Sequence, residues 1–582
     1  MRTNLLKSLA LPKLGSVRIV AAIVLIALCI ASAAFYECLA APVLTGDTSR
    51  PESSTFVIGE PVRLDFSVSN LGSSSDTLVV SVVDECGNAV GQWQTGVAGD
   101  TQGSWTGSWS APNDKLGFYR VYAKLSDGVV LAGVGSRPSG YITYCIVPDP
   151  AKRLNVDEQD ARFGMQGGFS TQVNILPYLG IRWVMVNYNW KSLEPDYPGQ
   201  FLINQQSAQK SNQQYPPRTP ETELVNYKGR HWQVYTVASL FDPPAWALAP
   251  GAKAGIAGAL SADGMTAWSN FCSNAAQDYA SNYPDQTQHY YQVTWEPVYP
   301  WNFSGTSSDL VDIYKTAYPA LHGADPEAVV LGPTYGNIWQ SSIAWHKSLV
   351  DLGLADSIDG VSIHPYFTLP TGPTAQGSEL PEISGPNGTL LQNVHTLSAM
   401  FPGKPFVGTE QGFNTNGDES KELLQAESLV RENLILLGEG YRFNIAFYIT
   451  DFKPDQDYGY YYNLLPDEPF GTTKMGPKPA APAYAAESFL LEGFHSVGPI
   501  QGLKNSEYGY AFTRGSETVL ALWDSTPQST TVQIPDPSGP VEQYDWMGNG
   551  NTVSPVNGTL SIPLSERPVY LAGPTASLQP QQ

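Results

Sequence analysis

The chain has 582 residues and a formal net charge of −22, from 32 basic and 54 acidic residues. A chain of this length exceeds what one hydrophobic core supports, so we expect about three domains. The acidic balance disfavours nucleic acid, whose binding needs basic patches, and it disfavours adhesion to an anionic membrane surface.

Residues 1–41 are predicted to be a targeting segment. Four basic residues between Arg2 and Arg18 precede an apolar run over residues 19–34, and small residues follow. This pattern is typical of a cleaved signal peptide, and an uncleaved N-terminal membrane anchor is the alternative. Both interpretations place the remaining chain outside the cytoplasm, either secreted, periplasmic or at the cell surface.

The five cysteines include no pair with CxxC spacing, so zinc and redox motifs are absent from the sequence. With no cluster of ligand residues either, we expect no metal and no organic cofactor. Cys86 and Cys145 fall in the same predicted domain. They are either a disulfide, as an oxidising compartment allows, or ordinary buried thiols.

Residues 42–150 are predicted to form an immunoglobulin-like β-sandwich. Apolar and polar residues alternate from Val62 to Val68, and Gly, Asn, Asp and Ser clusters separate further strand-like runs. Nothing in this domain has a catalytic pattern, which favours a spacer over an accessory ligand-binding module.

Residues 155–490 alternate short apolar strands with helical stretches, which predicts a (β/α)8 barrel. The eight predicted strands cover residues 162–165, 183–188, 233–240, 291–296, 329–332, 360–364, 405–409 and 444–449. A Pro/Ser-rich loop over residues 368–387 follows the sixth strand. A loop this long in a compact domain is usually functional or disordered, and here it is placed to cover a site.

Two of these strands end in a glutamate. Glu296 closes the fourth strand and is followed by Pro297, which cannot donate to a sheet ladder. Glu410 follows the seventh strand. Barrels of parallel strands carry their chemistry at the carboxyl ends of the strands. Two glutamates at that end are the minimum set of groups for acid/base and nucleophilic catalysis at a glycosidic bond.

From residue 491 to 575 the pattern returns to β, and we expect a C-terminal β-sandwich that packs on the last barrel helix. One clear strand runs from Thr518 to Trp523, and another from Thr530 to Ile534. The tail at residues 576–582 is predicted to be disordered.

Several short motifs, in this order and at this spacing, resemble the clan A (β/α)8 retaining glycoside hydrolases. The motifs are Gly180–Val184, Asn189-Trp190 with Leu193–Pro195, Pro243–Trp246, Thr294–Pro297, Ser362–Tyr366 and Gly408–Glu410. The resemblance is closest to family 39-like bacterial glycosidases, which include β-xylosidases and exopolysaccharide hydrolases, and it covers residues 160–575. It implies retention of the anomeric configuration, with Glu296 as acid/base and Glu410 as nucleophile.

The resemblance also implies that His364 or Tyr366 donates a hydrogen bond to the nucleophile and holds it ionised. Aromatic and amide residues near strand ends complete the expected substrate site, since indole rings stack against sugars. The candidate substrate-binding residues are His364, Tyr366, Trp295, Asn187, Trp246, Trp301 and Trp190.

Two positions depart from the family pattern. Trp295 stands where the family usually has an asparagine that binds the sugar 2-hydroxyl, and Met185 stands where it often has an arginine. The loss of the family's asparagine and arginine removes donors whose hydrogen bonds strengthen in the transition state. We interpret this as an altered substrate, with a different C2 configuration or substituent, or a chain held mainly by stacking.

The sequence therefore predicts an exported retaining glycosidase that acts on a poly- or oligosaccharide and has no obligate protein partner. The first alternative is a catalytically degenerate glycan-binding or matrix-assembly protein built on the hydrolase frame. A third, weaker hypothesis is an extracellular adhesin that uses its sandwich domains.

Overall fold

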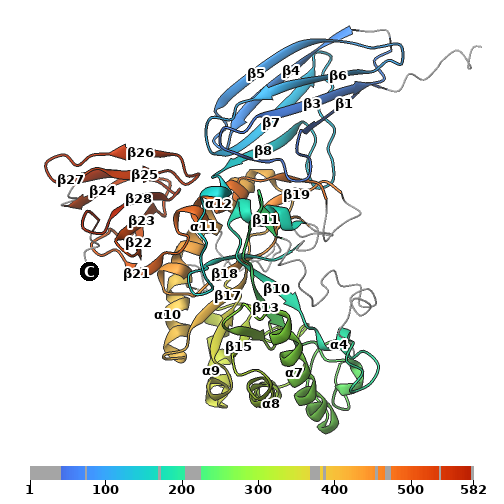
Figure 1. Cartoon of the computed structure of the whole chain (residues 1–582), viewed down its shortest axis with the longest axis vertical. Coiled ribbons are helices and arrows are strands. Elements are labelled where there is room, and N and C mark those ends of the chain that lie inside the picture. The colour runs from blue at the N-terminus through green and yellow to red at the C-terminus, as the bar shows by residue number, and fades with distance from the viewer. Residues whose placement is uncertain are drawn as a thin grey trace, which may run out of the picture.

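A computed structural model describes most of the chain after residue 40 (Figure 1). The described ranges are 41–72, 75–167, 172–202, 225–253, 255–366, 380–383, 388–451, 457–465, 473–535 and 539–578. The predicted leader, most of the loop at 368–387 and the last residues of the tail lie outside them. Within these ranges no helix is both long and apolar enough to cross a membrane.

The centre of the molecule is a closed barrel of eight parallel strands, as predicted. In chain order the strands are β9 (Phe163–Met165), β10 (Trp183–Asn187), β13 (Tyr235–Ser239), β14 (His289–Gln292), β15 (Ala328–Tyr335), β16 (Gly360–Ile363), β17 (Phe406–Gln411) and β18 (Asn444–Ala446). The eighth strand pairs with the first, Ile445 opposite Gly164, and this pairing closes the ring. Glu296 therefore follows the fourth strand of the barrel, and Glu410 lies in the seventh.

Helices surround the barrel. They include α7 (Ala262–Asn282), α8 (Ser307–Ala324), α9 (Ile343–Asp351), α10 (Leu390–Met400), α11 (Glu422–Gly438) and α12 (Ala480–Leu490). Two of them, α11 and α12, are buried along most of their length. Local sequence sets where several begin. The Thr306 hydroxyl accepts from the Asp309 amide while Asp309 bonds back, and Thr389 forms the same capping box with Gln392.

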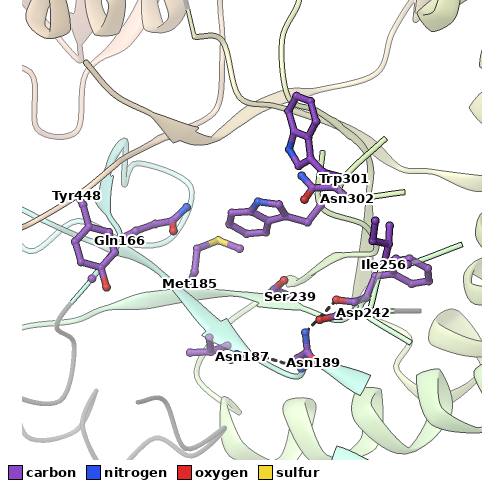
Figure 2. A pocket seen from close by; sticks show the side chains of 16 residues that line it. Gln166, Met185, Asn187, Asn189, Ser239, Asp242, Ile256, Trp301, Asn302 and Tyr448 are labelled. Atoms are coloured by element: carbon purple, nitrogen blue, oxygen red, sulfur yellow. Dashed lines mark hydrogen bonds between the residues drawn. The ribbon is translucent and has the colours of Figure 1, made fainter. Parts of the chain in front are cut away.

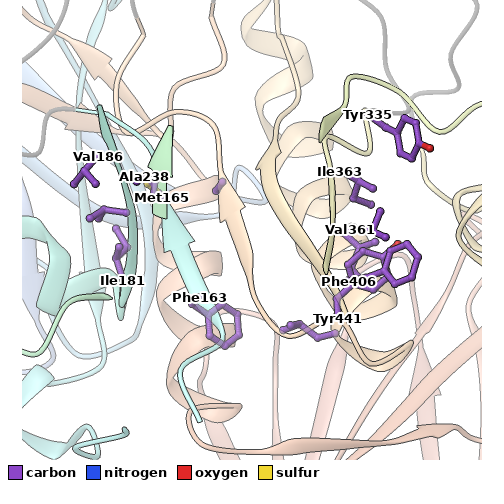
Figure 3. Close-up of a cluster of buried hydrophobic side chains, with 14 of the residues drawn as sticks. Phe163, Met165, Ile181, Val186, Ala238, Tyr335, Val361, Ile363, Phe406 and Tyr441 are labelled. Atoms are coloured by element: carbon purple, nitrogen blue, oxygen red, sulfur yellow. The ribbon is translucent and has the colours of Figure 1, made fainter. Parts of the chain in front are cut away.

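The period-two alternation of the strands divides the barrel into two apolar layers. Trp183 and Met185 of β10 face a cluster inside the barrel, whereas Val184 and Val186 face the helices. Figure 3 shows members of the outer layer, among them Val186, Ile363 and Phe406. Inside the barrel, Trp183 stacks on Phe443 with ring centroids 4.1 Å apart. This packed interior closes the barrel below the ends of the strands.

The chain before the barrel forms two sheets that share one core. The first sheet contains β1 (Val43–Thr48), β3 (Val62–Ser69) and β6 (Trp105–Ala111). The second contains β2 (Thr55–Val57), β8 (Tyr141–Val147), β7 (Gly117–Leu125), β4 (Ser75–Asp84) and β5 (Ala89–Ala98). We call residues 41–147 the N-terminal domain.

The chain after the barrel also forms β structure, with its own apolar core. One sheet contains β21 (His495–Pro499), β22 (Glu507–Arg514), β23 (Glu517–Asp524), β28 (Val569–Pro574), β25 (Val541–Tyr544) and β26 (Gly550–Val553). A two-stranded sheet pairs β24 (Thr530–Pro535) with β27 (Thr559–Leu564). The β22 side of this unit contacts α11, the helix after the seventh strand.

Several predicted strand boundaries were wrong, and two of them concern the glutamates. β14 ends at Gln292 and does not reach Glu296, because the backbone of Glu296 has a φ of +43° and turns out of the sheet. β17 continues through Gln411, so Glu410 lies within its strand and not after it. Both glutamates still lie at the carboxyl end of the barrel.

The structure excludes the disulfide alternative for Cys86 and Cys145, which are both free. Cys145 is buried with its thiol 3.5 Å from the Thr55 hydroxyl, while Cys86 is exposed and accepts a hydrogen bond from Arg567. The two side chains face different neighbours, so they have no shared position in which to bond.

The barrel interior supplies a stability prediction. Trp183→Ala removes a fully buried indole that packs on Phe443, Tyr235 and Tyr290, so we expect a loss of about 3–5 kcal/mol in the free energy of unfolding. Urea unfolding measures this loss. Trp301→Ala is the matched control, because Trp301 is 65% exposed and its removal is expected to change stability by less than about 0.5 kcal/mol. Equal losses would contradict the assignment of Trp183 to a packed interior.

Candidate active site

The two predicted glutamates meet across one site. A carboxylate oxygen of Glu296, a carboxylate oxygen of Glu410 and a ring nitrogen of His364 all lie within 4.8 Å of one another. The His364 Nδ1 atom is 2.9 Å from Glu296 Oε1 and 4.0 Å from Glu410 Oε1. Because a carboxylate only accepts, this short contact is an imidazole N–H donating to Glu296.

The backbone around Glu296 fits its unusual conformation. Gly336, which follows β15, lies against it so closely that a Cβ at Gly336 would be 2.8 Å from the Cβ of Glu296. A side chain at position 336 would thus displace the carboxylate. Asn302, in the loop after Glu296, points its amide at Glu296 Oε2 from 3.4 Å.

Glu410 is more deeply buried, with 6% exposure, and it accepts two hydrogen bonds. The Tyr366 hydroxyl donates to Oε1 at 2.6 Å, and the Gln166 amide donates to Oε2 at 3.2 Å. Gln166 also donates to the Thr409 carbonyl at 2.9 Å, which fixes its amide. Of the two predicted donors to Glu410, Tyr366 makes the bond, whereas His364 bonds Glu296.

Gln166 is a site residue that sequence reasoning missed. It directly follows β9, the first strand of the barrel, so the rule that picked out residues at other strand ends would have found it. Glutamine carries no titratable group and belongs to none of the motifs that suggested the family, and so it was not considered.

Burial and neighbouring charges shift the titration of this cluster. Burial raises the pKa of Glu410 to about 7, against the opposing effect of His364 and of the bonds from Tyr366 and Gln166, while the charge of Glu296 adds to the rise. Burial by itself would lower the pKa of His364, but the negative charges of Glu410 and Glu296 raise it above its ordinary value. The protonation of Glu410 and that of His364 therefore depend on each other.

A cavity of about 370 Å³ opens beside the glutamates over the ends of β9, β10 and β13 (Figure 2). Gln166 and Asn302, which bond the two carboxylates, both line it. Among the described residues its wall also contains Met185, Asn187, Asn189, Ser239, Phe241, Asp242, Ile256, Trp295, Trp301 and Tyr448. Glu296 and Glu410 are not among the residues that line the cavity, which reaches them through Gln166 and Asn302 and extends over the first three strands.

Three of the predicted substrate-binding residues line this cavity, namely Asn187, Trp295 and Trp301. Trp301 stacks on Tyr299 with centroids 4.5 Å apart and an interplanar angle of 9°, which holds an exposed indole at the rim. Trp295 meets His364 edge-on at 5.0 Å, so its ring is fixed on the wall next to the carboxylates.

Two predicted tryptophans lie elsewhere. Trp190 is completely buried, donates to Glu194 and packs against Trp268, so it is a core residue and offers no surface to a ligand. Trp246 donates to the Glu194 carbonyl and meets Trp190 edge-on at 5.5 Å. For Trp190 the prediction was wrong, because its ring packs into the helix layer. Trp246 is partly exposed but does not line this cavity, and its role in binding stays a prediction.

The arrangement suits direct displacement at a carbon between the two carboxylates. An inverting pair needs room for a water and stands about 6.5–9.5 Å apart, whereas a retaining pair stands about 5–5.5 Å apart. The side-chain types would also suit a divalent cation. However, His364 Nδ1 already bonds Glu296, and Tyr366 and Gln166 bond Glu410, so both carboxylates already have protein hydrogen-bond partners.

No protein-family profile matches the sequence, and a search of curated proteins finds no match. Among solved structures the chain is similar to a family 39 glycoside hydrolase from the gut symbiont Bacteroides cellulosilyticus WH2. The identity is 17%, the match covers 90% of this chain and 99% of that one, and the TM-score is 0.63. The resemblance to family 39 is therefore confirmed at the level of the fold.

Two weaker matches cover 72% of this chain and 97% of the other. They are a family 30 endoxylanase from Clostridium papyrosolvens C71, with 15% identity and a TM-score of 0.47, and a monomeric β-xylosidase from Caulobacter crescentus CB15, with 13% identity and a TM-score of 0.46. At these scores neither match adds to the fold assignment.

The raised pKa of Glu410 predicts how stability depends on pH. The folded protein holds a proton on this group up to about pH 7, whereas the unfolded chain releases it near pH 4.5, so stability falls as pH rises through that window. Glu410→Gln removes the free-energy cost of ionising this buried carboxyl group. We expect this variant to gain about 2–3 kcal/mol over the wild type at pH 8 and much less at pH 5, measured by urea unfolding.

The exposed Glu517→Gln serves as the control and should behave like the wild type at both pH values. If the difference in the free energy of unfolding between Glu410→Gln and the wild type is the same at pH 5 and pH 8, Glu410 does not titrate in this range.

Proposed function

We propose that this protein is a retaining glycoside hydrolase that cleaves O-glycosidic bonds of a polysaccharide. One observation carries the proposal: a carboxylate oxygen of Glu296, which follows the fourth strand of a closed barrel, and one of Glu410, in the seventh strand, lie within 4.8 Å of each other. Such closeness favours a retaining pair over an inverting pair, which needs room for a water between its carboxyl groups.

In the proposed reaction, Glu410 attacks the anomeric carbon while Glu296 gives its proton to the leaving oxygen. The bond between the anomeric carbon and that oxygen breaks, and a covalent glycosyl ester forms on Glu410. Glu296, now a carboxylate, then takes a proton from water, which attacks the anomeric carbon and releases Glu410. The sugar keeps its anomeric configuration because the carbon is inverted twice.

The neighbours of the two glutamates support these separate roles. Tyr366 and Gln166 both donate to Glu410, which favours its ionised form and aims its oxygens. His364 donates to one oxygen of Glu296 and leaves the other, which faces Asn302, for the substrate. Because the coupled cluster must hold one proton in the reactive state, activity should follow a bell-shaped pH profile.

The cavity supports a carbohydrate substrate bound by stacking and by uncharged polar groups. Trp301 offers an exposed indole at the rim, and Asn187, Asn189 and Ser239 offer amide and hydroxyl groups over the second and third strands. Met185 and Trp295 replace the family's guanidinium and amide, so we infer a sugar with an altered C2 configuration or substituent. The leader supports a location outside the cytoplasm, and the shared cores of the flanking sheets support two β-sandwich domains.

The test is hydrolysis of a panel of bacterial and plant polysaccharides, followed by reducing-sugar release. We expect Glu410→Gln to lower kcat by about 10³-fold or more, because the covalent route is lost. Glu296→Ala should lose hydrolysis of the polysaccharide, because the leaving oxygen is no longer protonated. On an aryl glycoside whose phenolate leaves without a proton, added azide should attack the glycosyl ester and give a glycosyl azide with the starting configuration. Trp301→Ala is the comparison variant and should raise KM more than it lowers kcat. An azide product of inverted configuration would contradict the retaining mechanism.

A second candidate is a catalytically degenerate protein that binds glycan on the hydrolase frame. Trp295 and Met185 favour it, since both replace donors to the sugar with side chains that cannot play that role. This candidate predicts binding of a polysaccharide without turnover, and equal affinity in the wild type and in Glu410→Gln. Affinity electrophoresis of both proteins in polysaccharide gels, run beside the hydrolysis assay, separates the two candidates.

A further inference from the structure

A buried carboxylate joins the N-terminal domain to the loop that follows the eighth barrel strand. Asp451 is 4% exposed and accepts three hydrogen bonds. Lys478 Nζ donates at 2.7 Å, the Ser136 hydroxyl at 2.9 Å and the Gly459 amide at 2.9 Å. Ser136 lies between β7 and β8, so one side chain ties together three separate segments.

The contact between the N-terminal domain and the barrel is close at the level of the backbone. The Ser136 amide donates to the Asn463 carbonyl at 2.8 Å, and the Asn463 amide donates to the Ser136 hydroxyl at 2.9 Å. A Cβ at Gly135 would lie 1.9 Å from the Asn463 carbonyl oxygen. Only glycine fits there, so the approach of the two units is specified by sequence.

The barrel side of this contact is equally tight. A Cβ at Gly459 would lie 2.2 Å from the Asp451 amide nitrogen and 2.6 Å from its carboxylate. The Asp451 amide also donates to the Tyr461 carbonyl at 2.9 Å. The described residues on both sides of segment 452–456 are therefore fixed to each other by Asp451.

Gly459 is preceded by Tyr458, whose ring contacts the tyrosine that bonds the proposed nucleophile. Tyr458 meets Tyr366 edge-on with centroids 6.0 Å apart, and Tyr366 donates to Glu410 at 2.6 Å. Gly412 lies under both rings, since a Cβ there would be 2.9 Å from Tyr458 and 3.4 Å from Tyr366. Burial raises the pKa of Tyr458, and the negative charge of Glu410 adds to the rise, in keeping with this proximity.

We propose that Asp451 is a positioning residue through which the N-terminal domain holds Tyr458 and Tyr366 against the nucleophile. This inference rests on the proposed function, because it assigns the reactive role to Glu410. Asp451 acts only through other residues, and Ser136 is the contribution of the N-terminal domain to its position. The N-terminal domain is then part of the catalytic assembly and not the passive spacer that the sequence favoured.

The physical consequence concerns the hydrogen bond to Glu410. If Gly459 shifts, the Tyr458 ring no longer packs against Tyr366, and the Tyr366 hydroxyl loses its fixed direction. A weaker bond favours the protonated form of the nucleophile, because hydrogen bonds to the ionised form are what oppose the effect of burial. A loss of support at Ser136 should therefore move the acidic limb of the activity profile to higher pH.

The test compares two changes at the same domain interface. Ser136→Ala removes the bond to Asp451, whereas Thr55→Val removes the buried bond between Thr55 and the Tyr461 hydroxyl, 3.0 Å long, on the same face. We expect similar decreases in Tm. On a polysaccharide that the wild type hydrolyses, only Ser136→Ala should lower kcat, by about 2- to 10-fold with KM unchanged, and shift the acidic limb upward.

Two further variants sharpen the comparison. Asp451→Asn should lower kcat by about 10- to 100-fold with the same shift of the acidic limb, since it loses its ion pair with Lys478 as well. Ser136→Thr keeps the hydroxyl and should retain the wild-type profile. If Ser136→Ala and Thr55→Val have the same kcat and the same pH profile, the inference is overturned.

A readout without turnover keeps this inference separate from the proposed function. Weaker support of Glu410 should enlarge the fall in stability between pH 5 and pH 8 in Ser136→Ala, and the enlargement should vanish in the Glu410→Gln background. A wild type that hydrolyses no glycan would contradict the proposed function alone. An unchanged stability difference in Ser136→Ala, or one that persists without Glu410, would contradict the positioning role.

Discussion

The structure depends on one electrostatic constraint, the confinement of two carboxylates and one imidazole to a space less than 5 Å across. Two negative charges this close inside a protein cannot both persist unless cations or donors surround them. His364, Tyr366 and Gln166 meet that need; His364 and Tyr366 follow β16, and Gln166 follows β9. The closed barrel is the device that brings these strand ends together.

The barrel can hold such a cluster because its interior is closely packed with side chains. Trp183, Tyr235, Tyr290 and Phe443 fill the lower layer, so the strand ends have little freedom to move apart. Above this layer the side chains become polar, and the burial of Glu410 makes its charge state sensitive to every donor nearby. Stability and reactivity therefore oppose each other at the same residue, as is common where function requires a buried charge.

The flanking domains have unequal relations to this cluster. The C-terminal β unit contacts α11, which lies in the helix layer outside the barrel strands. The N-terminal domain instead reaches the loop after β18 through Ser136, and that loop carries Tyr458. A domain with no catalytic pattern of its own can thus contribute to a site by fixing the backbone that surrounds it.

The sequence by itself determined the barrel, its eight strands and the strand numbers of both glutamates, because period-two patterns and strand-end residues are local signals. It could not decide the side-chain directions. Trp190 and Trp295 both follow strand ends, yet one is buried among the helices and the other lines the cavity. Only the tertiary structure assigned His364 to Glu296 and revealed Gln166, because these contacts join residues 68 and 244 positions apart and the first depends on a turn at Glu296 that no local pattern encodes. It also separated Cys86 from Cys145, whose side chains have different neighbours.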